Sequence, residues 1–199
     1  MKKILLILMM CVASFSTIYA QNNIRFNGAT FGTNVATFMK DFCKGEDSKY
    51  YKSKSDEIYN SDICNGYWGS TFINSEKWYF WAFSSRETDT VFRTICTHSY
   101  SSDLQGNVML LVKVLEEKYG GHREENKSDL GYIHDGSYKF KEMFALYYYI
   151  KNASNQVIGE VRISCAPRGN GGLVELSYRD VAANDKAIRE YNNIINNTF

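Results

Sequence analysis

The stretch between His122 and Asp135 holds the densest group of side chains that could bind a metal ion. It contains two imidazoles and four carboxylates: His122, Glu124, Glu125, Asp129, His134 and Asp135. Nitrogen and oxygen donors of this kind hold the zinc ion of many hydrolases. The stretch lacks an H-E-x-x-H spacing, so we interpret these charges as solvated loop residues and expect no cofactor. A metal-dependent hydrolase acting through this loop is kept as an alternative.

Residues 1–20 have the composition of a secretory signal peptide. Lys2 and Lys3 give a positive start, residues 4–13 form a short apolar run, and Ala20 ends a more polar segment that suits cleavage. The apolar run is about half of the roughly 20 residues that a spanning helix needs. The residue before Cys11 is too large for a lipoprotein signal. We therefore expect a periplasmic or secreted protein with no membrane span.

Export changes how the cysteines are interpreted, because disulfides form in oxidising compartments. After loss of residues 1–20 four remain: Cys43, Cys64, Cys96 and Cys165. An even count permits disulfides, and the sequence leaves three pairings open. We favour Cys43–Cys64, because a helix end and a following strand can meet across a loop of this length. Such a loop of about 20 residues would contribute about 3 kcal/mol. The alternative is that some or all are buried free thiols.

The composition is that of an ordinary globular protein. Of 199 residues, 44% are hydrophobic and 23% are charged, which argues against extensive disorder. The net charge of +1 becomes −1 when Lys2 and Lys3 are removed. No basic block is present, so we expect no nucleic-acid partner. Aromatic residues are abundant, with 15 Tyr, 12 Phe and 3 Trp, and this directs attention to the strands that carry them.

The order of predicted elements repeats once along the chain. A helix over 33–44 precedes three strands near 67–74, 77–84 and 90–97, and a helix between Asp103 and Gly120 precedes three strands near 142–151, 156–166 and 172–179. A last helix covers 181–195. Consecutive strands beside helices indicate the α+β class. We predict two tandem helix-plus-three-strand units, 21–100 and 101–199, in one compact domain, with a curved antiparallel sheet and helices on one face.

Two of the predicted strands are aromatic or apolar at nearly every position. They have the sequences WYFWAF, from Trp78, and FALYYYI, from Phe144. Helices cover only one face of the predicted sheet, so the other face should be an aromatic binding surface. The residues that we expect in solvent are Trp68, Trp78, Phe80, Tyr147 and Tyr149, with Tyr79, Trp81 and Tyr148 facing the helices, and the reverse orientation stays open. The alternative is that these strands are central and covered on both faces.

A known family shares the pattern that starts each half. The first half carries Phe26, Gly28, Gly32, Phe38, Phe42 and Gly45 before its three strands, and in the second half Tyr119-Gly120 closes the helix. This resembles the β-lactamase-inhibitor-protein-like family of exported bacterial proteins. The resemblance implies protein binding through a concave aromatic sheet face, without catalysis. The chain departs from the family in lacking a lipoprotein signal and in a shorter first helical part.

These observations favour an exported, non-enzymatic binding protein whose partner is another protein. A glycan partner stays possible, because aromatic platforms also bind sugars. The hypothesis from a different class is a structural envelope protein that oligomerises through its aromatic strands. It predicts the same exposed rings but a self-associating surface.

Overall fold

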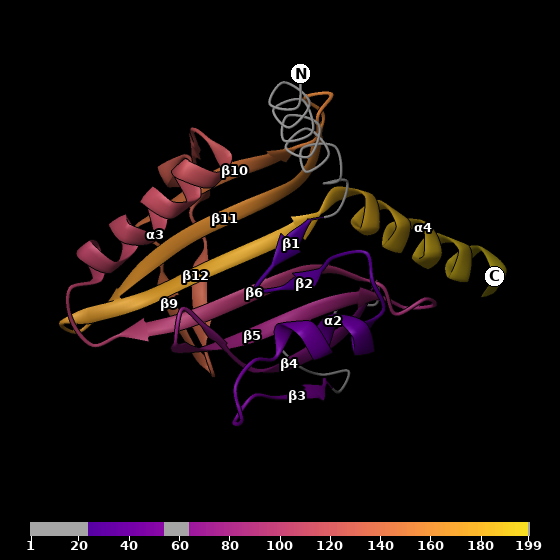
Figure 1. Cartoon of the computed structure of the whole chain (residues 1–199), viewed down its shortest axis with the longest axis horizontal. Helices are drawn as coiled ribbons and strands as arrows, with labels where there is room; N and C mark the ends of the chain where they lie inside the picture. The colour runs from indigo at the N-terminus through magenta and orange to yellow at the C-terminus, as the bar shows by residue number, and fades with distance from the viewer. Residues whose placement is uncertain (1–23, 54–63, 199) are drawn as a thin grey trace, which may run out of the picture.

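The centre of the fold is an eight-stranded antiparallel sheet with the strand order β3-β4-β5-β6-β12-β11-β10-β7 (Figure 1). The structure is a computed structural model that describes residues 24–53 and 64–198. The strands of this sheet are β3 (Lys49–Lys52), β4 (Cys64–Ile73), β5 (Glu76–Ser85), β6 (Val91–Tyr100), β7 (Arg123–Glu124), β10 (Phe144–Lys151), β11 (Val157–Arg168) and β12 (Gly171–Asp180). Strands from residues 21–100 and from 101–199 meet where β6 pairs with β12.

The other elements of the described ranges 24–53 and 64–198 are three α-helices and short hairpins. The helices are α2 (Val35–Phe42), α3 (Leu104–Tyr119) and α4 (Val181–Thr198). The hairpins are β1 (Arg25–Phe26) with β2 (Ala29–Thr30), and β8 (Tyr132–Asp135) with β9 (Tyr138–Lys141); a 3-10 turn η1 covers Lys127–Asp129. Among the described residues, no helix is both long and apolar enough to cross a membrane.

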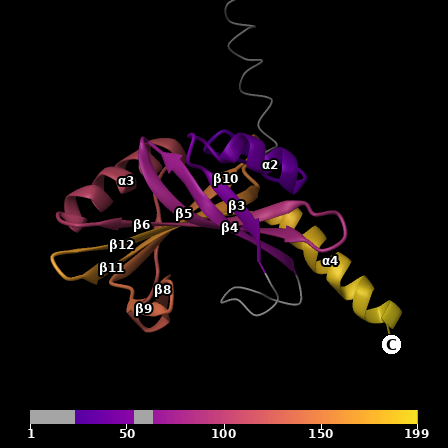
Figure 2. The same ribbon diagram turned by 90° about the horizontal axis from the view of Figure 1, so that it is seen from below.

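One side of the sheet, here called the core face, is covered by α2 and α3 (Figure 2). Asn34 caps α2 by accepting a hydrogen bond from the Ala36 amide. The apolar spacing of α2 then buries Val35, Phe38, Met39 and Phe42 in the same cluster as Phe80 of β5. From α3, Val108, Val112 and Leu115 enter this cluster. Most of the apolar core therefore lies between the two helices and the sheet.

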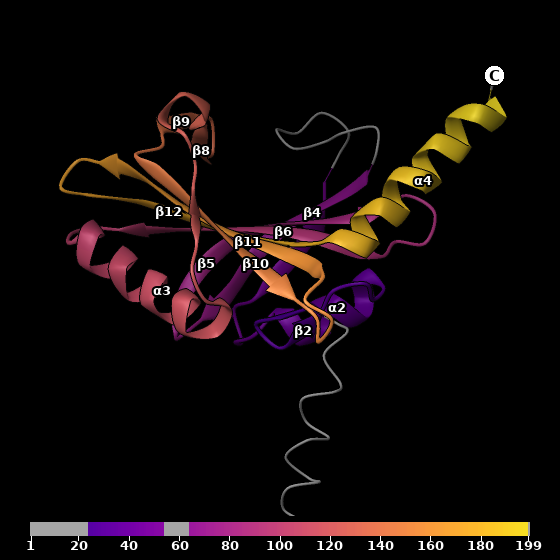
Figure 3. The same ribbon diagram turned by 90° about the horizontal axis from the view of Figure 1, so that it is seen from above.

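On the opposite side of the sheet, here called the outer face, the described residues that cover it belong to α4 and the β8–β9 hairpin (Figures 2 and 3). The start of α4 packs Ala183 and Ala187 against Phe83, Phe92 and Ile95. The β8–β9 hairpin packs Ile133 and Phe140 against Ala166 and Leu173. Alternate residues of a strand point to opposite faces, so each long strand contributes to both the core and the outer face.

The α+β class and the large antiparallel sheet are confirmed. The expectation that all helices share one face is wrong, because α4 lies on the outer face while α2 and α3 lie on the core face. The division into tandem units at residue 100 stays a prediction. The signal peptide predicted over residues 1–20 lies outside the described residues.

The expected Cys43–Cys64 disulfide is wrong. None of the four described cysteines forms a disulfide. Cys43 packs against the core-face cluster and Cys64 belongs to the cluster under α4, so the sheet separates the two sulfur atoms. Burial raises the pKa of the Cys43 and Cys165 thiols to about 11, which keeps them protonated at neutral pH.

Candidate functional site

A single row of side chains crosses the outer face from one sheet edge to the other. Residues directly opposite in the ladders share a face, and the pairing gives the order Tyr51, Trp68, Trp81, Ile95, Ser177, Arg162, Tyr147 and Arg123. The row is aromatic at the β3 end and cationic at the β7 end. Its middle lies under α4, since Trp81 and Ile95 pack in the cluster with Ala183. The row therefore presents two separate surfaces to solvent.

The first surface is an aromatic patch that consists of Tyr51, Trp68 and Tyr79. These side chains are 50%, 40% and 61% exposed. The rings of Tyr51 and Trp68 stack with centroids 5.0 Å apart and planes inclined by 34°. Together with Lys49, Lys77 and Asp47, the patch lines a shallow hollow of about 290 Å³. It thus offers a rigid aromatic platform flanked by two ammonium groups and one carboxylate.

The structure corrects the orientation predicted for β5. Trp78 and Phe80, expected in solvent, are 1% and 2% exposed and belong to the core-face cluster. Their neighbours Tyr79 and Trp81 point to the outer face instead, because β5 turns its even-numbered aromatic residues toward α2. Phe80, for example, meets Phe42 edge-on at 5.0 Å between ring centroids.

On β4 and β10 the predicted orientation is correct. Trp68 is exposed on the outer face. Tyr147 and Tyr149 lie on the same face and are half-buried, while Tyr148 points into the core. The expected contacts therefore do not form one surface: Trp68 belongs to the aromatic patch, whereas Tyr147 and Tyr149 lie at the far side of the sheet.

The second surface is built around Arg162 of β11. Its Nη1 and Nη2 donate to the two carboxylate oxygens of Glu142 at 2.8 and 2.6 Å, and its Nε donates to the Tyr147 hydroxyl at 3.1 Å. Glu142 also accepts from the Gly131 amide at 2.8 Å. Burial alone would raise the pKa of Glu142, but the hydrogen bonds and charge of Arg162 lower it below its usual value. The pair is therefore ionised at neutral pH.

Glu175 of β12 is a buried carboxyl beside this pair. Its Oε1 lies 3.7 Å from Arg162 Nη1. Burial, with the charge of Glu142 adding to it, raises the pKa of Glu175 to about 7, although Arg162 acts in the opposite direction. Glu175 is thus the one group of this cluster whose charge changes near neutral pH.

A polar cleft of about 180 Å³ opens beside Arg162. Its walls are Arg93, Tyr147, Glu160, Arg162, Ser177 and Arg179. Glu160 and Arg179 form an ion pair at 2.5 Å across β11 and β12, and the Tyr147 ring lies 4.9 Å from Arg123 and 5.6 Å from Arg162. Three arginines and one glutamate line the cleft, so its charged lining residues sum to +2. Arg162 and Arg179 are each ion-paired with a carboxylate.

The residues of the proposed metal loop do not gather at one point. His122 Nδ1 lies 3.1 Å from Glu116 Oε1 at the side of α3. His134 and Asp135 belong to β8 on the outer face, where Asp135 pairs with Arg168. In the described parts of the chain, no group of three or more His, Cys, Asp or Glu side chains is arranged to hold a metal ion. The geometry that the hydrolase alternative required is therefore not formed.

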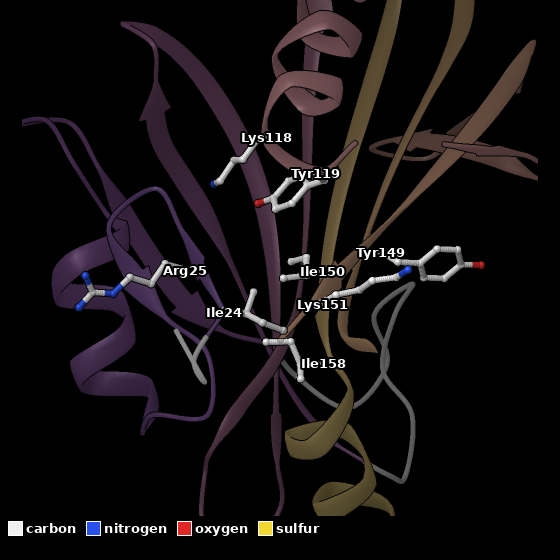
Figure 4. Close-up of a pocket in the computed structure, with 8 residues that line it drawn as sticks. All are labelled: Ile24, Arg25, Lys118, Tyr119, Tyr149, Ile150, Lys151 and Ile158. Carbon is white, nitrogen blue, oxygen red and sulfur yellow. The ribbon is translucent and has the colours of Figure 1, made fainter. Parts of the chain in front are cut away.

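A further hollow of about 250 Å³ lies where β1, the end of α3, β10 and β11 meet (Figure 4). Ile24, Ile150 and Ile158 form its apolar part, and Lys118 and Tyr119 lie together on one side. Arg25 and Tyr149 also line it, but the guanidinium and the phenol ring point away from its centre in Figure 4. The polar groups of this hollow do not converge on a common point.

Sequence reasoning missed the Arg162 cluster, although polar and apolar residues alternate along β11. The alternation places Arg162 and Ser164 on one face and Val161 and Ile163 on the other, as observed. Glu142 lies before β10 and reaches Arg162 across the sheet, and no local signal links the two. Compared with known proteins, the chain matches no family model, no curated protein and no solved structure.

Proposed function

We propose that this chain is an exported, non-enzymatic binding protein that recognises another protein through the aromatic patch of Tyr51, Trp68 and Tyr79. The observation that carries this proposal is the exposure of three large aromatic side chains side by side on a rigid sheet. Tyrosine and tryptophan offer large contact areas at low entropic cost, and they dominate binding hot spots. Residues 1–20, with the composition of a signal peptide, support a periplasmic or secreted location.

The position of the patch also favours a protein partner. It lies at the β3 end of the described sheet, where an edge strand offers backbone groups for pairing with an added strand. All four residues of β3 are exposed. The flanking Lys49 and Lys77 favour a partner segment that carries acidic side chains. A strand with acidic and apolar side chains would match both the edge and the patch.

The thiols of the core support binding rather than covalent catalysis. Burial raises the pKa of Cys96 well above its usual value, with the charge of Glu175 adding to the effect. Burial is also the main reason that the pKa of the Cys165 thiol is raised. A protonated, buried thiol is a poor nucleophile. The resemblance to β-lactamase-inhibitor-like proteins, which bind proteins through an aromatic sheet face, is consistent with this proposal.

Paired double variants test the proposal. Tagged wild-type protein and a W68A/Y79A variant are crosslinked to the envelope fraction of the producing cell, and the captured partner is then purified and titrated. We expect binding to weaken by about 1,000-fold, because each of the two anchors contributes about 2 kcal/mol at a hot spot and about 1.4 kcal/mol corresponds to a factor of ten in affinity. The matched control is Y132A/Y138A, which removes two exposed tyrosines from the β8–β9 hairpin. Equal affinity of W68A/Y79A and the wild type would contradict the proposal.

The same variants distinguish a glycan partner from a protein partner. Binding to purified envelope polysaccharide that is lost in W68A/Y79A, with no protein captured, would assign the patch to sugars. Protease treatment of the envelope fraction before capture abolishes binding if the partner is a protein. This outcome is the one that we expect.

A further inference from the structure

A groove lies between α3 and β10, which run beside each other at one end of the sheet (Figure 1). We call it the α3–β10 groove. It has a volume of about 420 Å³ and shares no lining residue with the aromatic patch or with the cleft beside Arg162. Its apolar lining residues are Met109, Val112, Leu130, Met143, Phe144 and Leu146.

Two exposed methionines stand on opposite walls of this groove. Met109 of α3 is 59% exposed and Met143, just before β10, is 55% exposed, whereas Met39, the third methionine of the described ranges, is buried in the core. Methionine adapts its shape to a partner and is common at surfaces that accept amphipathic helices. Leu110 and Val114, both exposed, continue the apolar surface along α3. The exposed apolar surface therefore extends along the helix beyond the groove, which suits an elongated ligand.

The rim of the α3–β10 groove is acidic. Glu116, Glu124 and Glu125 line it against a single lysine, Lys127, so with His122 neutral the charged lining residues sum to −2, from three carboxylates and one ammonium group. Within the described ranges, Glu116 and Glu124 form ion pairs with His122, and no lysine or arginine pairs with any of the three glutamates. Unneutralised carboxylates around an apolar groove favour a ligand that is both apolar and cationic.

The walls of the groove favour a helical ligand over an added strand. One wall is α3, which lines the groove over two turns from Met109 to Glu116. The other wall is β10, whose backbone is already occupied on this side, since β7 pairs with it and the Ala145 carbonyl accepts from the Glu125 amide at 2.9 Å. A strand therefore cannot add to β10 here. Recognition falls to side chains, as it does where an amphipathic helix lies in an apolar groove.

We propose that the α3–β10 groove binds a basic amphipathic helix of a partner protein. The apolar stripe of that helix lies between Met109 and Met143, and its lysine or arginine side chains lie beside Glu116 and Glu124. An acidic helix of the same shape meets repulsion from the rim, so charge sets the specificity. The groove and the aromatic patch are separate surfaces, so this proposal is independent of the proposed function.

A synthetic peptide of leucine and lysine, about four turns long and with leucine at helical spacing, is the probe. Methionine methyl groups labelled with carbon-13 report where it binds by NMR, and the variants M109L and M143L assign the two groove signals. We expect the peptide to shift both groove signals saturably and to leave the signal of the buried Met39 unchanged. The same peptide with glutamate in place of lysine should shift neither, and nor should a peptide of equal composition with leucine at every second position.

Paired variants test the acidic rim. E116Q/E124Q removes two exposed rim carboxylates, and we expect it to weaken peptide binding by about tenfold at low ionic strength and by less in high salt. The matched control E117Q/D185N removes two exposed carboxylates that do not line the groove and should bind like the wild type. Equal affinities of the two double variants would overturn the proposal.

A second pair of variants tests the apolar walls. M109S/M143S should weaken binding by about tenfold or more, while the control V157S/I188S, at two apolar residues that are equally exposed elsewhere, should not. Circular dichroism checks that each variant is folded, which the exposure of all four side chains favours.

Three further outcomes would overturn the proposal. The first is that the lysine peptide shifts neither groove methionine. The second is that W68A/Y79A abolishes peptide binding, which would place the peptide on the aromatic patch. The third is that hexylamine shifts both signals at the same concentration as the peptide, which would assign the groove to a small apolar cation.

Discussion

Arg162 of β11 holds both carboxylate oxygens of Glu142 on the outer face of the sheet, at 2.8 and 2.6 Å. The Glu142 side chain is 2% exposed, and Glu142 immediately precedes Met143 and the first residue of β10. The pair thus connects the chain between the β8–β9 hairpin and β10 to the centre of the sheet. The Gly131 amide, which donates to the same carboxylate, adds the start of the hairpin to this connection.

Loss of the Glu142 carboxylate should be strongly destabilising. We expect E142Q to lower the free energy of unfolding by about 3 kcal/mol, because it leaves the guanidinium of Arg162 without its charged partner. Urea unfolding at pH 7 measures the change. The matched control is E160Q, which breaks the more exposed Glu160–Arg179 pair and should cost about 1 kcal/mol or less. Equal losses in the two variants would show that burial of the Arg162 pair has no energetic importance.

The buried Glu175 predicts a stability that falls as pH rises. Its pKa is raised to about 7 in the folded protein, against about 4.3 in the unfolded chain. Between these values the folded state holds a proton that the unfolded state has lost, so the free energy of unfolding decreases with increasing pH. The contribution is on the order of 3 kcal/mol. We expect E175Q to be more stable than wild type at pH 8 and to show little difference at pH 4.5, measured by urea unfolding. A pH profile identical to wild type would contradict this.

The sequence predicted strands and helices well where one face is polar. In β11, Val161 and Ile163 alternate with Arg162 and Ser164, and the structure places them as the alternation indicates. In β5 the run from Trp78 is aromatic on both faces, so alternation could not orient it. Tertiary packing decided the orientation, since Phe80 meets Phe42 of α2. The position of α4 on the outer face likewise depends on packing against β5 and β6, which no local sequence pattern indicates.

The β8–β9 hairpin was not predicted, although the sequence contains a turn motif that indicates it. The charged residues between His122 and Asp135 were interpreted as loop residues, yet this stretch contains β8 and leads through a turn into β9. Asp135-Gly136 between two short aromatic segments is a hairpin signal, and Gly136 has the positive φ of 60° that such a turn requires. The Arg162–Glu142 pair had no comparable signal, because its two residues are distant in sequence and meet only through the sheet order.

The neighbouring residues Trp78 and Tyr79 should respond oppositely to substitution. Trp78 is buried in the core face, so W78A should cost about 3–5 kcal/mol of unfolding free energy. Tyr79 is 61% exposed, and Y79A should cost less than about 1 kcal/mol. Chemical unfolding of the two variants measures both values. A larger loss for Y79A than for W78A would reverse the assigned orientation of β5 and remove Tyr79 from the aromatic patch.

The free thiols predict a stability that is insensitive to reductant. We expect the four described cysteines to react with a thiol reagent when the protein is unfolded without reductant, since none of them forms a disulfide. The melting temperature should be the same with and without reductant. A Cys43–Cys64 bridge would instead leave two thiols, and reduction would lower stability by about 3 kcal/mol.

The base of α4 depends on Glu190, which binds the turn between β5 and β6. Its Oε2 accepts from the amides of Glu87 and Thr88 at 3.2 and 3.3 Å, and its Oε1 accepts from the Thr88 hydroxyl at 2.8 Å. Burial alone would raise the pKa of Glu190, but these hydrogen bonds lower it below its usual value. The stabilisation is therefore present above the ordinary glutamate pKa and is lost as pH falls through the lowered value.

We expect E190Q to cost about 2 kcal/mol at pH 7, the size of hydrogen bonds to a charged acceptor, and the cost should shrink below pH 4. Hydrogen exchange locates the effect, because the amides of Glu87 and Thr88 and the first turns of α4 should lose protection together, while β11 and β12 keep theirs. The matched control D185N changes an exposed acid of the same helix and should leave protection unchanged. Protection in E190Q equal to that of the wild type would show that the apolar contacts of Ala183 and Ala187 alone fix the helix.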